Sequence, residues 1–365
     1  MELLKIILLE GENPMKIQAQ RSSVRFYQGR STLPIVDRHK LVKLANGIHK
    51  GPFGTKIRMK STEKKMGTFN YITTDKKLEK NPYYIVGCVS TNVDVPEKTD
   101  RIDFGYEFEK IILYASALGV GTCWLGGTFL ENEANSILDV NTDTEKVYAI
   151  TPFGMEKTEL DINERKKKNG FTRMVMRNTR KPNNLMFFID VYGNEIQFDT
   201  VAQTLGEPKS LIGLLKKHGQ LGEYEEEQEE GKKNEEKEET KNEKQNQEKK
   251  PQQLDYDLIR KLEKEKPQEL SEIWEGIFES VKWAPSAVNE QDWRIVFDQS
   301  ERAFHFLIES TRSHYCFLNI GIAMLHFELS CLWYGYTGRW EKLKKSNTSW
   351  KLPKDVTYSS TFYMD

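Results

Sequence analysis

The sequence predicts a fold that mixes helices and strands and is built from two similar halves. The apolar residues of 106–118 recur at helical spacing, whereas Tyr83–Val89 is a short apolar run typical of a strand buried on both faces. A shift of 216 positions sets the helix that ends at Gly119 against a second apolar helix that ends at Gly335. Because helices often end at glycine, this single match favours a repeat without establishing it.

The first half is expected to alternate helices and strands. The predicted elements are a helix over Leu33–Ile48, strands at Thr68–Ile72 and Tyr83–Val89, the helix 106–118, a short helix at Asn132–Leu138 and a buried strand at Lys146–Pro152. After the helix 106–118, the β-prone run Thr122–Leu125 leads into Gly126-Gly127. Two glycines after a buried strand indicate either a tight bend or a backbone that another group approaches closely.

The second half begins with an amphipathic helix at Leu270–Trp283, followed by strands at Arg294–Phe297 and Phe304–Ser310. The next segment, Tyr315–Tyr334, is apolar enough to raise the question of a membrane span. It contains Asn319, His326 and Glu328, and polar or charged groups are costly inside a bilayer. We therefore expect a core helix and no membrane association.

A highly charged segment, Gly222–Gln253, separates the two halves. It has almost no apolar residues, so burial cannot offset the entropy lost on ordering. We expect a disordered insertion, with a solvated Glu/Lys helix as the alternative. The predicted organisation is an N-terminal extension (1–15), a first half (16–221), the insertion (222–253) and a second half (254–365).

Composition and motifs exclude several functions. The net charge of −1 over 365 residues gives no electrostatic basis for nucleic-acid binding. The four cysteines are far apart in apolar surroundings, which predicts reduced, buried thiols in a cytoplasmic setting. The sequence contains no H-E-x-x-H, G-x-S-x-G or Walker loop, and Gly119-x-Gly121 fails the dinucleotide fingerprint because Trp124 stands where its last glycine belongs.

Several residues spread over the chain are of the types that bind a polar, anionic ligand. Arg21, Arg25 and the pair Arg180-Lys181 could hold a phosphate. Ser22, Ser23, Ser286 and Asn289 could form hydrogen bonds, and Gly126-Gly127 could present backbone N–H groups. Considered singly, each residue also fits a solvated loop or an ordinary turn.

Taken together, these motifs resemble those of one family. Arg21–Arg25 resembles the opening R-x-S-x-R of FMN-dependent nitroreductases, Ala117–Gly127 resembles their second signature, and Ala284–Arg294 resembles their P-S-x-x-N-x-Q-P-W-R loop. In ordinary members that loop precedes the glycine signature, but here it lies near the C-terminus. This order, together with Arg180-Lys181-Pro182 and the helix 320–329, resembles the single-chain pseudo-dimer branch, the putative TM nitroreductases.

Three positions depart from the family pattern. Ser22 stands where a second basic residue is common, Asp292 replaces the proline after Gln291, and Asn319 replaces an acid that is common just before the I-G-I-A motif at 320–323. We expect Ser22 to weaken one contact with the phosphate and Asp292 to loosen the loop. The change at Asn319 is expected to affect the structure and not the binding of a ligand.

The resemblance implies an α+β fold, a nitroreductase-like sandwich built as an intrachain pseudo-dimer, with one FMN between the halves of a monomer. It implies ping-pong hydride transfer through flavin N5, from NADH or NADPH to a small electron-poor acceptor such as a nitroaromatic or quinone, without a catalytic acid–base side chain. The FMN-binding residues that it implies are Arg21, Ser22, Ser23, Arg25, Leu125, Gly126, Gly127, Arg180, Lys181, Pro285, Ser286, Ala287, Asn289 and Gln291.

Individual roles also follow from the resemblance. Arg21 and Arg180-Lys181 are expected at the phosphate, Arg25 at the pyrimidine end of the ring, and the N–H groups of Gly126 and Gly127 near N5. The alternative function is a flavin-binding carrier or sensor without turnover, in which Phe53 or Trp293 would block the ring face. A reductive dehalogenase-like activity is a third possibility within the enzyme class.

Overall fold

The computed structural model describes residues 1–25, 27–64, 66, 82–91, 98–157, 180–220, 254–267, 269–309, 314–343 and 350–365. Two sequence-based expectations fall outside these residues: the strand Thr68–Ile72 and the charged segment Gly222–Gln253.

The first sheet has five antiparallel strands. Their order is β1 (Gly47–Lys50), β2 (Lys56–Thr62), β3 (Tyr83–Ser90), β5 (Glu145–Gly154) and β4 (Gly121–Thr122). β3 lies in the middle and its interior residues are buried on both faces, as its apolar sequence predicts. The short helix α5 (Glu131–Leu138) covers the outer face of this sheet.

The second sheet has six strands. Their order is β10 (Gly338–Glu341), β11 (Val356–Met364), β9 (Ala303–Glu309), β8 (Trp293–Asp298), β6 (Phe187–Ile189) and β7 (Val191–Glu195). All pairs are antiparallel except β6 with β8. Because β6 and β7 precede residue 221, the expected boundary between the halves does not coincide with the division between the sheets.

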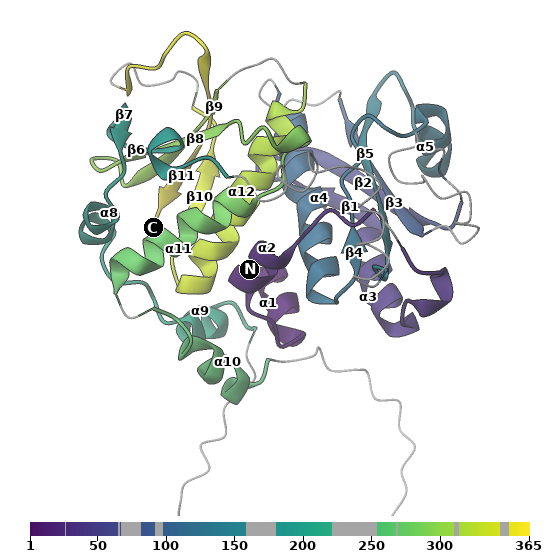
Figure 1. Ribbon diagram of the computed structural model, residues 1–365, viewed down its shortest axis with the longest axis horizontal. Helices are drawn as coiled ribbons and strands as arrows, with labels where there is room; N and C mark the ends of the chain where they lie inside the picture. The colour runs from purple at the N-terminus through teal and green to yellow at the C-terminus, as the bar shows by residue number, and fades with distance from the viewer. Residues whose placement is uncertain are drawn as a thin grey trace, which may run out of the picture.

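The two sheets share a topology. Four strands of the first follow the spatial order β2-β3-β5-β4, and four strands of the second follow β8-β9-β11-β10, which is the same order along the chain. In each half a long helix follows the second strand: α4 (Thr99–Ala117) and α12 (Cys316–Tyr334). Both helices are followed by a left-handed glycine, Gly119 with φ of 68° and Gly335 with φ of 93°. The chain is therefore an intrachain pseudo-dimer (Figure 1).

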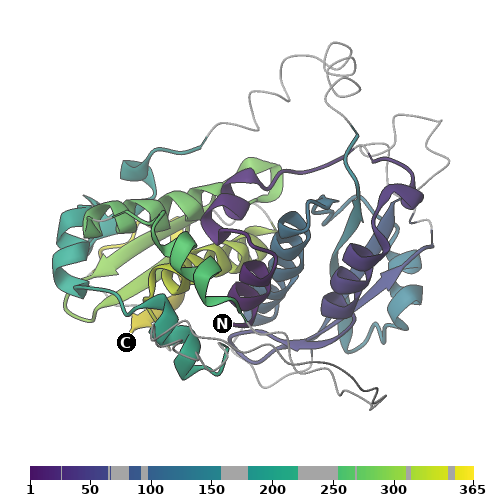
Figure 2. The same cartoon turned by 90° about the horizontal axis from the view of Figure 1, so that it is seen from below.

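The two long helices lie between the sheets and pack against each other (Figures 1 and 2). Beside them lie α11 (Leu270–Trp283), α2 (Pro14–Gln20) and α1 (Glu2–Leu9). The remaining elements are α3 (Ile35–Ala45), α8 (Phe198–Leu205), α9 (Leu211–Lys217), α10 (Tyr256–Glu263) and the short 3-10 turns η1 (Arg30–Thr32), η2 (Asn183–Leu185) and η3 (Ala287–Asn289). The result is an α+β sandwich with most of its core between the two sheets.

Some predicted boundaries were wrong. The first-half helix ends at Ala45, and Gly47–Lys50 forms edge strand β1 because its backbone pairs with β2. The helix expected from residue 106 begins at Thr99. The expected strand Thr122–Leu125 is reduced to Gly121–Thr122 and a single bridge between Leu125 and Ile150.

Buried polar groups join the two core helices. Glu109 of α4 contacts His326 of α12 at 3.1 Å, and both side chains are fully buried. His326 Nδ1 donates to the carbonyl oxygen of Ser280 at 3.0 Å, since a carbonyl can only accept. Since Nδ1 carries its own hydrogen, one further proton lies between His326 Nε2 and the Glu109 carboxylate. The indole N–H of Trp124 donates a second hydrogen bond to Glu109 at 2.6 Å.

Among the described residues, one helix, α12, is long and apolar enough to span a membrane, and 89% of its most apolar window is buried inside the protein. His326 and Glu328 point to different partners on α4, Glu109 and Tyr106. These contacts confirm a core helix. All four cysteines are buried and unpaired, as predicted.

Candidate functional site

The segment around Arg21 runs beside the start of the glycine signature. Arg21 directly follows α2, Ser23 forms a parallel bridge with Thr122, and the N–H of Val24 donates to the Thr122 carbonyl at 2.8 Å. Burial raises the pKa of the Cys123 thiol, and the positive charges of Arg25 and Arg21 oppose that rise. Both guanidinium groups therefore lie within electrostatic reach of this strand.

Arg180 lies close to Arg21 although the two are far apart in the sequence. Burial lowers the pKa of Arg180, and the positive charge of Arg21 lowers it further. The Arg180 guanidinium lies over the Trp283 ring, 5.2 Å from its centroid, and its Nη1 donates to Asn289 Oδ1 at 2.6 Å. Its Nε is buried and has no hydrogen-bond acceptor among the described residues. Two cations within electrostatic range of each other, with a buried donor on Arg180 that lacks an acceptor, form a site that an anion would stabilise.

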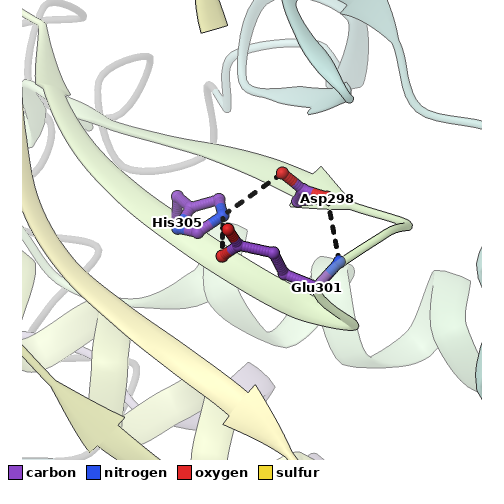
Figure 3. A group of neighbouring side chains, drawn as sticks. All are labelled: Asp298, Glu301 and His305. Atoms are coloured by element: carbon purple, nitrogen blue, oxygen red, sulfur yellow. Dashed lines mark hydrogen bonds and ion pairs between the residues drawn. The ribbon is translucent and has the colours of Figure 1, made fainter. Parts of the chain in front are cut away.

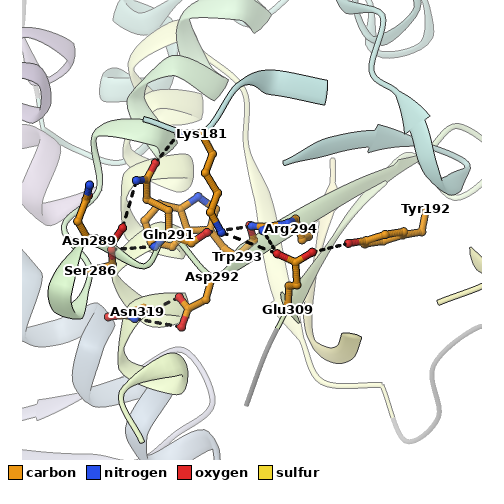
Figure 4. A network of polar contacts seen from close by, with 10 residues as sticks. All are labelled: Lys181, Tyr192, Ser286, Asn289, Gln291, Asp292, Trp293, Arg294, Glu309 and Asn319. Atoms are coloured by element: carbon orange, nitrogen blue, oxygen red, sulfur yellow. Dashed lines mark hydrogen bonds and ion pairs between the residues drawn. The ribbon is translucent and has the colours of Figure 1, made fainter. Parts of the chain in front are cut away.

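The loop after α11 is held in shape by its own polar groups (Figure 4). Ser286 Oγ accepts from the N–H of Gln291 at 3.0 Å, and Gln291 Nε2 donates to the Asn289 carbonyl at 3.2 Å. Gln291 Oε1 accepts from the backbone N–H of Lys181 at 2.9 Å, which fixes residues 180–181 against the loop. The loop therefore sets the position of Arg180.

This loop is also strained. Val288, Asn289 and Gln291 have positive φ angles of 45°, 60° and 48°. Such values are uncommon for residues other than glycine and are least favourable for a β-branched residue such as Val288, which is 79% exposed. Backbone strain of this kind often accompanies a functional loop.

The Lys181 side chain extends away from Arg180. Its ammonium lies 3.8 Å from Glu309 Oε2, beside the buried Arg294 that also pairs with Glu309 (Figure 4). Burial and the charge of Arg294 lower the pKa of Lys181. Lys181 thus contributes its backbone to the loop contact, while Arg180 contributes a side chain.

Two of the three departures from the family pattern contact each other. Asn319 Nδ2 donates to both carboxylate oxygens of Asp292 at 3.1 Å, and Asn319 Oδ1 accepts from the N–H of Ala287 at 3.0 Å. Burial raises the pKa of Asp292 to about 6, against the effect of the Asn319 hydrogen bonds. An acid at position 319 would repel the Asp292 carboxylate, whereas the amide of Asn319 donates hydrogen bonds to it. The two departures from the family pattern therefore compensate each other.

Gly126 and Gly127 are approached closely by the ring of Tyr315, which directly precedes α12. A Cβ added at Gly126 would lie 2.6 Å from Tyr315 Cε1, and one at Gly127 would lie 2.5 Å from the Tyr315 hydroxyl oxygen. A side chain at either position would therefore displace the Tyr315 ring from its present place. Sequence reasoning missed Tyr315 because no motif includes it, and it likewise missed Trp283, which packs under Arg180.

The structure thus brings together residues that are far apart in the sequence. Arg21, Arg180 and Asn289 converge, Pro285–Gln291 borders them, and Tyr315 connects α12 to Gly126-Gly127. Ser22 is half-buried, and Arg25 is exposed. Of the two candidates for blocking a ring face, Trp293 is fully buried at the start of β8, and the backbone N–H of Phe53 donates to Asp103 on α4.

The sequence matches the family described as "Putative TM nitroreductase" over residues 14–192 and 235–331. The second match begins inside the segment 222–253. Because the matched residues make up well over half of the chain, the protein belongs to this nitroreductase family.

Among solved structures, a "putative nitroreductase" from Thermotoga maritima is 16% identical, with a TM-score of 0.47 over 97% of this chain and 94% of that one. A nitroreductase family protein from Clostridium novyi is 20% identical, with a TM-score of 0.33 over 41% of this chain and 88% of that one. A nitroreductase with bound FMN from Bacteroides fragilis is 17% identical, with a TM-score of 0.29 over 40% of this chain and 89% of that one. No curated protein matches the chain.

Proposed function

We propose that this protein is an FMN-dependent oxidoreductase that takes electrons from NADH or NADPH and passes them to a small electron-poor acceptor. The observation that carries the proposal is the convergence of Arg21, Arg180 and Asn289 from three separate motifs. Membership of a nitroreductase family and the FMN bound to the Bacteroides fragilis nitroreductase support the same cofactor.

The donor set suits a phosphate monoester. Two guanidinium groups offer planar pairs of N–H donors, and the buried Nε of Arg180 needs an acceptor. The hydroxyl of Ser23 and the loop Pro285–Gln291 would bind the ribityl chain and ring edge. Bound FMN would supply the redox chemistry, by accepting and donating hydride at N5. The exposed Arg25 would favour negative charge that develops on the ring.

The expected biological setting follows from the sequence. We propose a monomer with one flavin site, because both halves that border the site belong to one chain. Nitroaromatics and quinones are the proposed acceptor classes, and the unpaired thiols favour the cytoplasm.

The test is to reconstitute the purified protein with FMN, record the visible spectrum and add NADH or NADPH without oxygen. We expect bound flavin whose absorbance is bleached by one nucleotide and restored by a quinone. A protein that fails to bind FMN would refute the whole proposal.

A second candidate function is a flavin-binding carrier or sensor without turnover. The contact of Tyr315 with Gly126-Gly127 favours it, since this ring occupies the close-approach surface that hydride chemistry at N5 would use. Flavin that binds but is not bleached by either nucleotide would support this alternative.

A further inference from the structure

Three side chains with metal-ligating atoms gather at the far end of β8. Asp298 is the last residue of β8, Glu301 lies in the turn that follows, and His305 lies in β9 (Figure 3). Their ligand atoms all lie within 4.8 Å of one another. β8 begins at Trp293, next to the candidate flavin site, so this group lies at the opposite end of the strand.

His305 is the central member of the group. Its side chain is fully buried, and its Nδ1 lies 2.9 Å from the hydroxyl oxygen of Thr361 on β11. Its Nε2 has no hydrogen-bond partner among the described residues. Instead, Nε2 faces Asp298 Oδ2 at 4.0 Å and Glu301 Oε2 at 3.9 Å, distances too long for a hydrogen bond.

A neutral imidazole does not satisfy this arrangement. The ring is fully buried, and in its neutral form it carries a single N–H. If Nδ1 donates to Thr361, the lone pair of Nε2 points toward two carboxylates, and in the other tautomer its N–H lacks an acceptor. Burying either group unsatisfied costs free energy.

The Asp298 carboxylate is held in place by hydrogen bonds from its own turn. The Ser300 hydroxyl donates to it at 2.6 Å, and the N–H groups of Ser300 and Glu301 donate to it at 2.9 and 3.1 Å. These bonds end on Oδ1, which leaves Oδ2 toward His305. Glu301 lies at the solvent side with 40% of its side chain exposed.

We propose that His305 Nε2, Asp298 Oδ2 and the Glu301 carboxylate bind a divalent transition-metal ion, with water completing its coordination. One nitrogen and two carboxylate oxygens suit Zn²⁺ or Mn²⁺, whereas Mg²⁺ and Ca²⁺ prefer oxygen alone. Metal–ligand bonds of about 2.0–2.2 Å need a small inward movement, which the exposed Glu301 side chain can make.

The surroundings resemble those of other metal sites. A ligating histidine usually has its second ring nitrogen bound, and here Thr361 holds Nδ1. Ligating carboxylates are also fixed by hydrogen bonds, and here Ser300 fixes Asp298. The indole of Trp350 lies against the His305 ring, with centroids 4.0 Å apart. The site therefore carries a built-in fluorescent reporter.

The test uses the full chain, stripped of metal with a chelator and titrated with Zn²⁺ by calorimetry. Glu301→Gln removes one ligand charge from an exposed side chain, so the variant is expected to fold. Glu195→Gln makes the same change at an exposed position on β7 of the same sheet and serves as the control. A parallel titration with Co²⁺ monitors tryptophan quenching in wild type and Trp350→Phe.

We expect one Zn²⁺ per chain in wild type and Glu195→Gln, at least ten-fold weaker binding in Glu301→Gln, and Co²⁺ quenching that is reduced in Trp350→Phe. Equal affinity of wild type and Glu301→Gln would mean adventitious binding elsewhere and would overturn the proposal. Absence of saturable binding of Zn²⁺ or Mn²⁺ would overturn it as well. Flavin binding is measured separately, so neither result depends on the proposed oxidoreductase function.

Discussion

Gly105 of α4 and Gly321 of α12 occupy equivalent positions where the two core helices cross. A Cβ on Gly105 would overlap the carbonyl oxygen of Leu318, and a Cβ on Gly321 would overlap the carbonyl oxygen of Ile102. Both glycines and both carbonyls are 216 positions apart, the same shift that relates Gly119 to Gly335. The two halves therefore contact each other through equivalent residues of the repeat.

This crossing predicts that alanine at either glycine destabilises the protein. The obstacle is backbone in a helix, which cannot move aside as a side chain would, so we expect Gly105→Ala and Gly321→Ala each to cost about 2–3 kcal/mol or more in urea unfolding. Gly213→Ala is the matched control, because it lies in a helix and a Cβ there would meet only Ser210 at 3.8 Å. Control-like stability of the first two variants would contradict the close crossing.

The buried Asp292 predicts a pH dependence of stability. Its folded pKa of about 6 exceeds its ordinary value of 3.8, so its contribution to stability is full below about pH 4 and is lost as the pH rises through 6. The side chain of Asp292→Asn does not titrate. Between pH 4 and pH 7 the free energy of unfolding of this variant should therefore rise by about 2–3 kcal/mol relative to that of wild type. The control is Asp143→Asn, a change at an exposed position. Its free energy of unfolding should stay parallel to that of wild type over the same pH range. A constant difference between wild type and Asp292→Asn would contradict the assignment.

The strained loop predicts a stabilising substitution. At Val288, with φ of 45°, glycine has no Cβ to clash, so we expect Val288→Gly to raise thermal stability by about 1 kcal/mol. Val288→Ala keeps a Cβ but removes the branch, and its stability should lie between those of valine and glycine. A glycine variant less stable than wild type would show that the loop is not strained at this residue.

The ring over the glycine pair predicts a gain in flavin affinity. If Tyr315 must leave Gly126-Gly127 for flavin to approach, Tyr315→Ala removes that cost and should tighten FMN binding by roughly ten-fold, about 1.4 kcal/mol. Tyr315→Phe keeps the ring and should behave as wild type in the same fluorescence titration. Weaker FMN binding in the alanine variant would instead place Tyr315 among the groups that hold the flavin.

Much of the fold could be predicted from local patterns. Leu270–Trp283 is a helix over its full predicted range, and β3 is a central strand, because period and burial determine these elements within a short window. Edge strand β1 could not be predicted, since its backbone is extended only because β2 lies beside it. The pairing of β6 with β8 depends in the same way on residues over a hundred positions away.

At the candidate site, too, only the features that depend on local sequence could be predicted. Motifs predicted the residue types at Arg21, Arg180 and Asn289, which lie within the residues that match the family. They could not predict that Arg180 rather than Lys181 faces Asn289, because this depends on the side-chain partners Glu309 and Gln291. Tyr315 could not be predicted, because its place over the glycines is set by how α12 crosses α4.

The central claim is that Arg21 and Arg180 hold the phosphate of FMN, and comparing FMN with riboflavin tests it most directly, because riboflavin lacks only that phosphate. We expect wild type to prefer FMN by at least about 100-fold, since two charged hydrogen bonds contribute about 1.5–3 kcal/mol each. Arg180→Gln should lose most of this preference while its riboflavin affinity stays unchanged, and Arg339→Gln, an exposed arginine on β10, should keep it. Equal affinity of wild type for FMN and riboflavin would contradict the account.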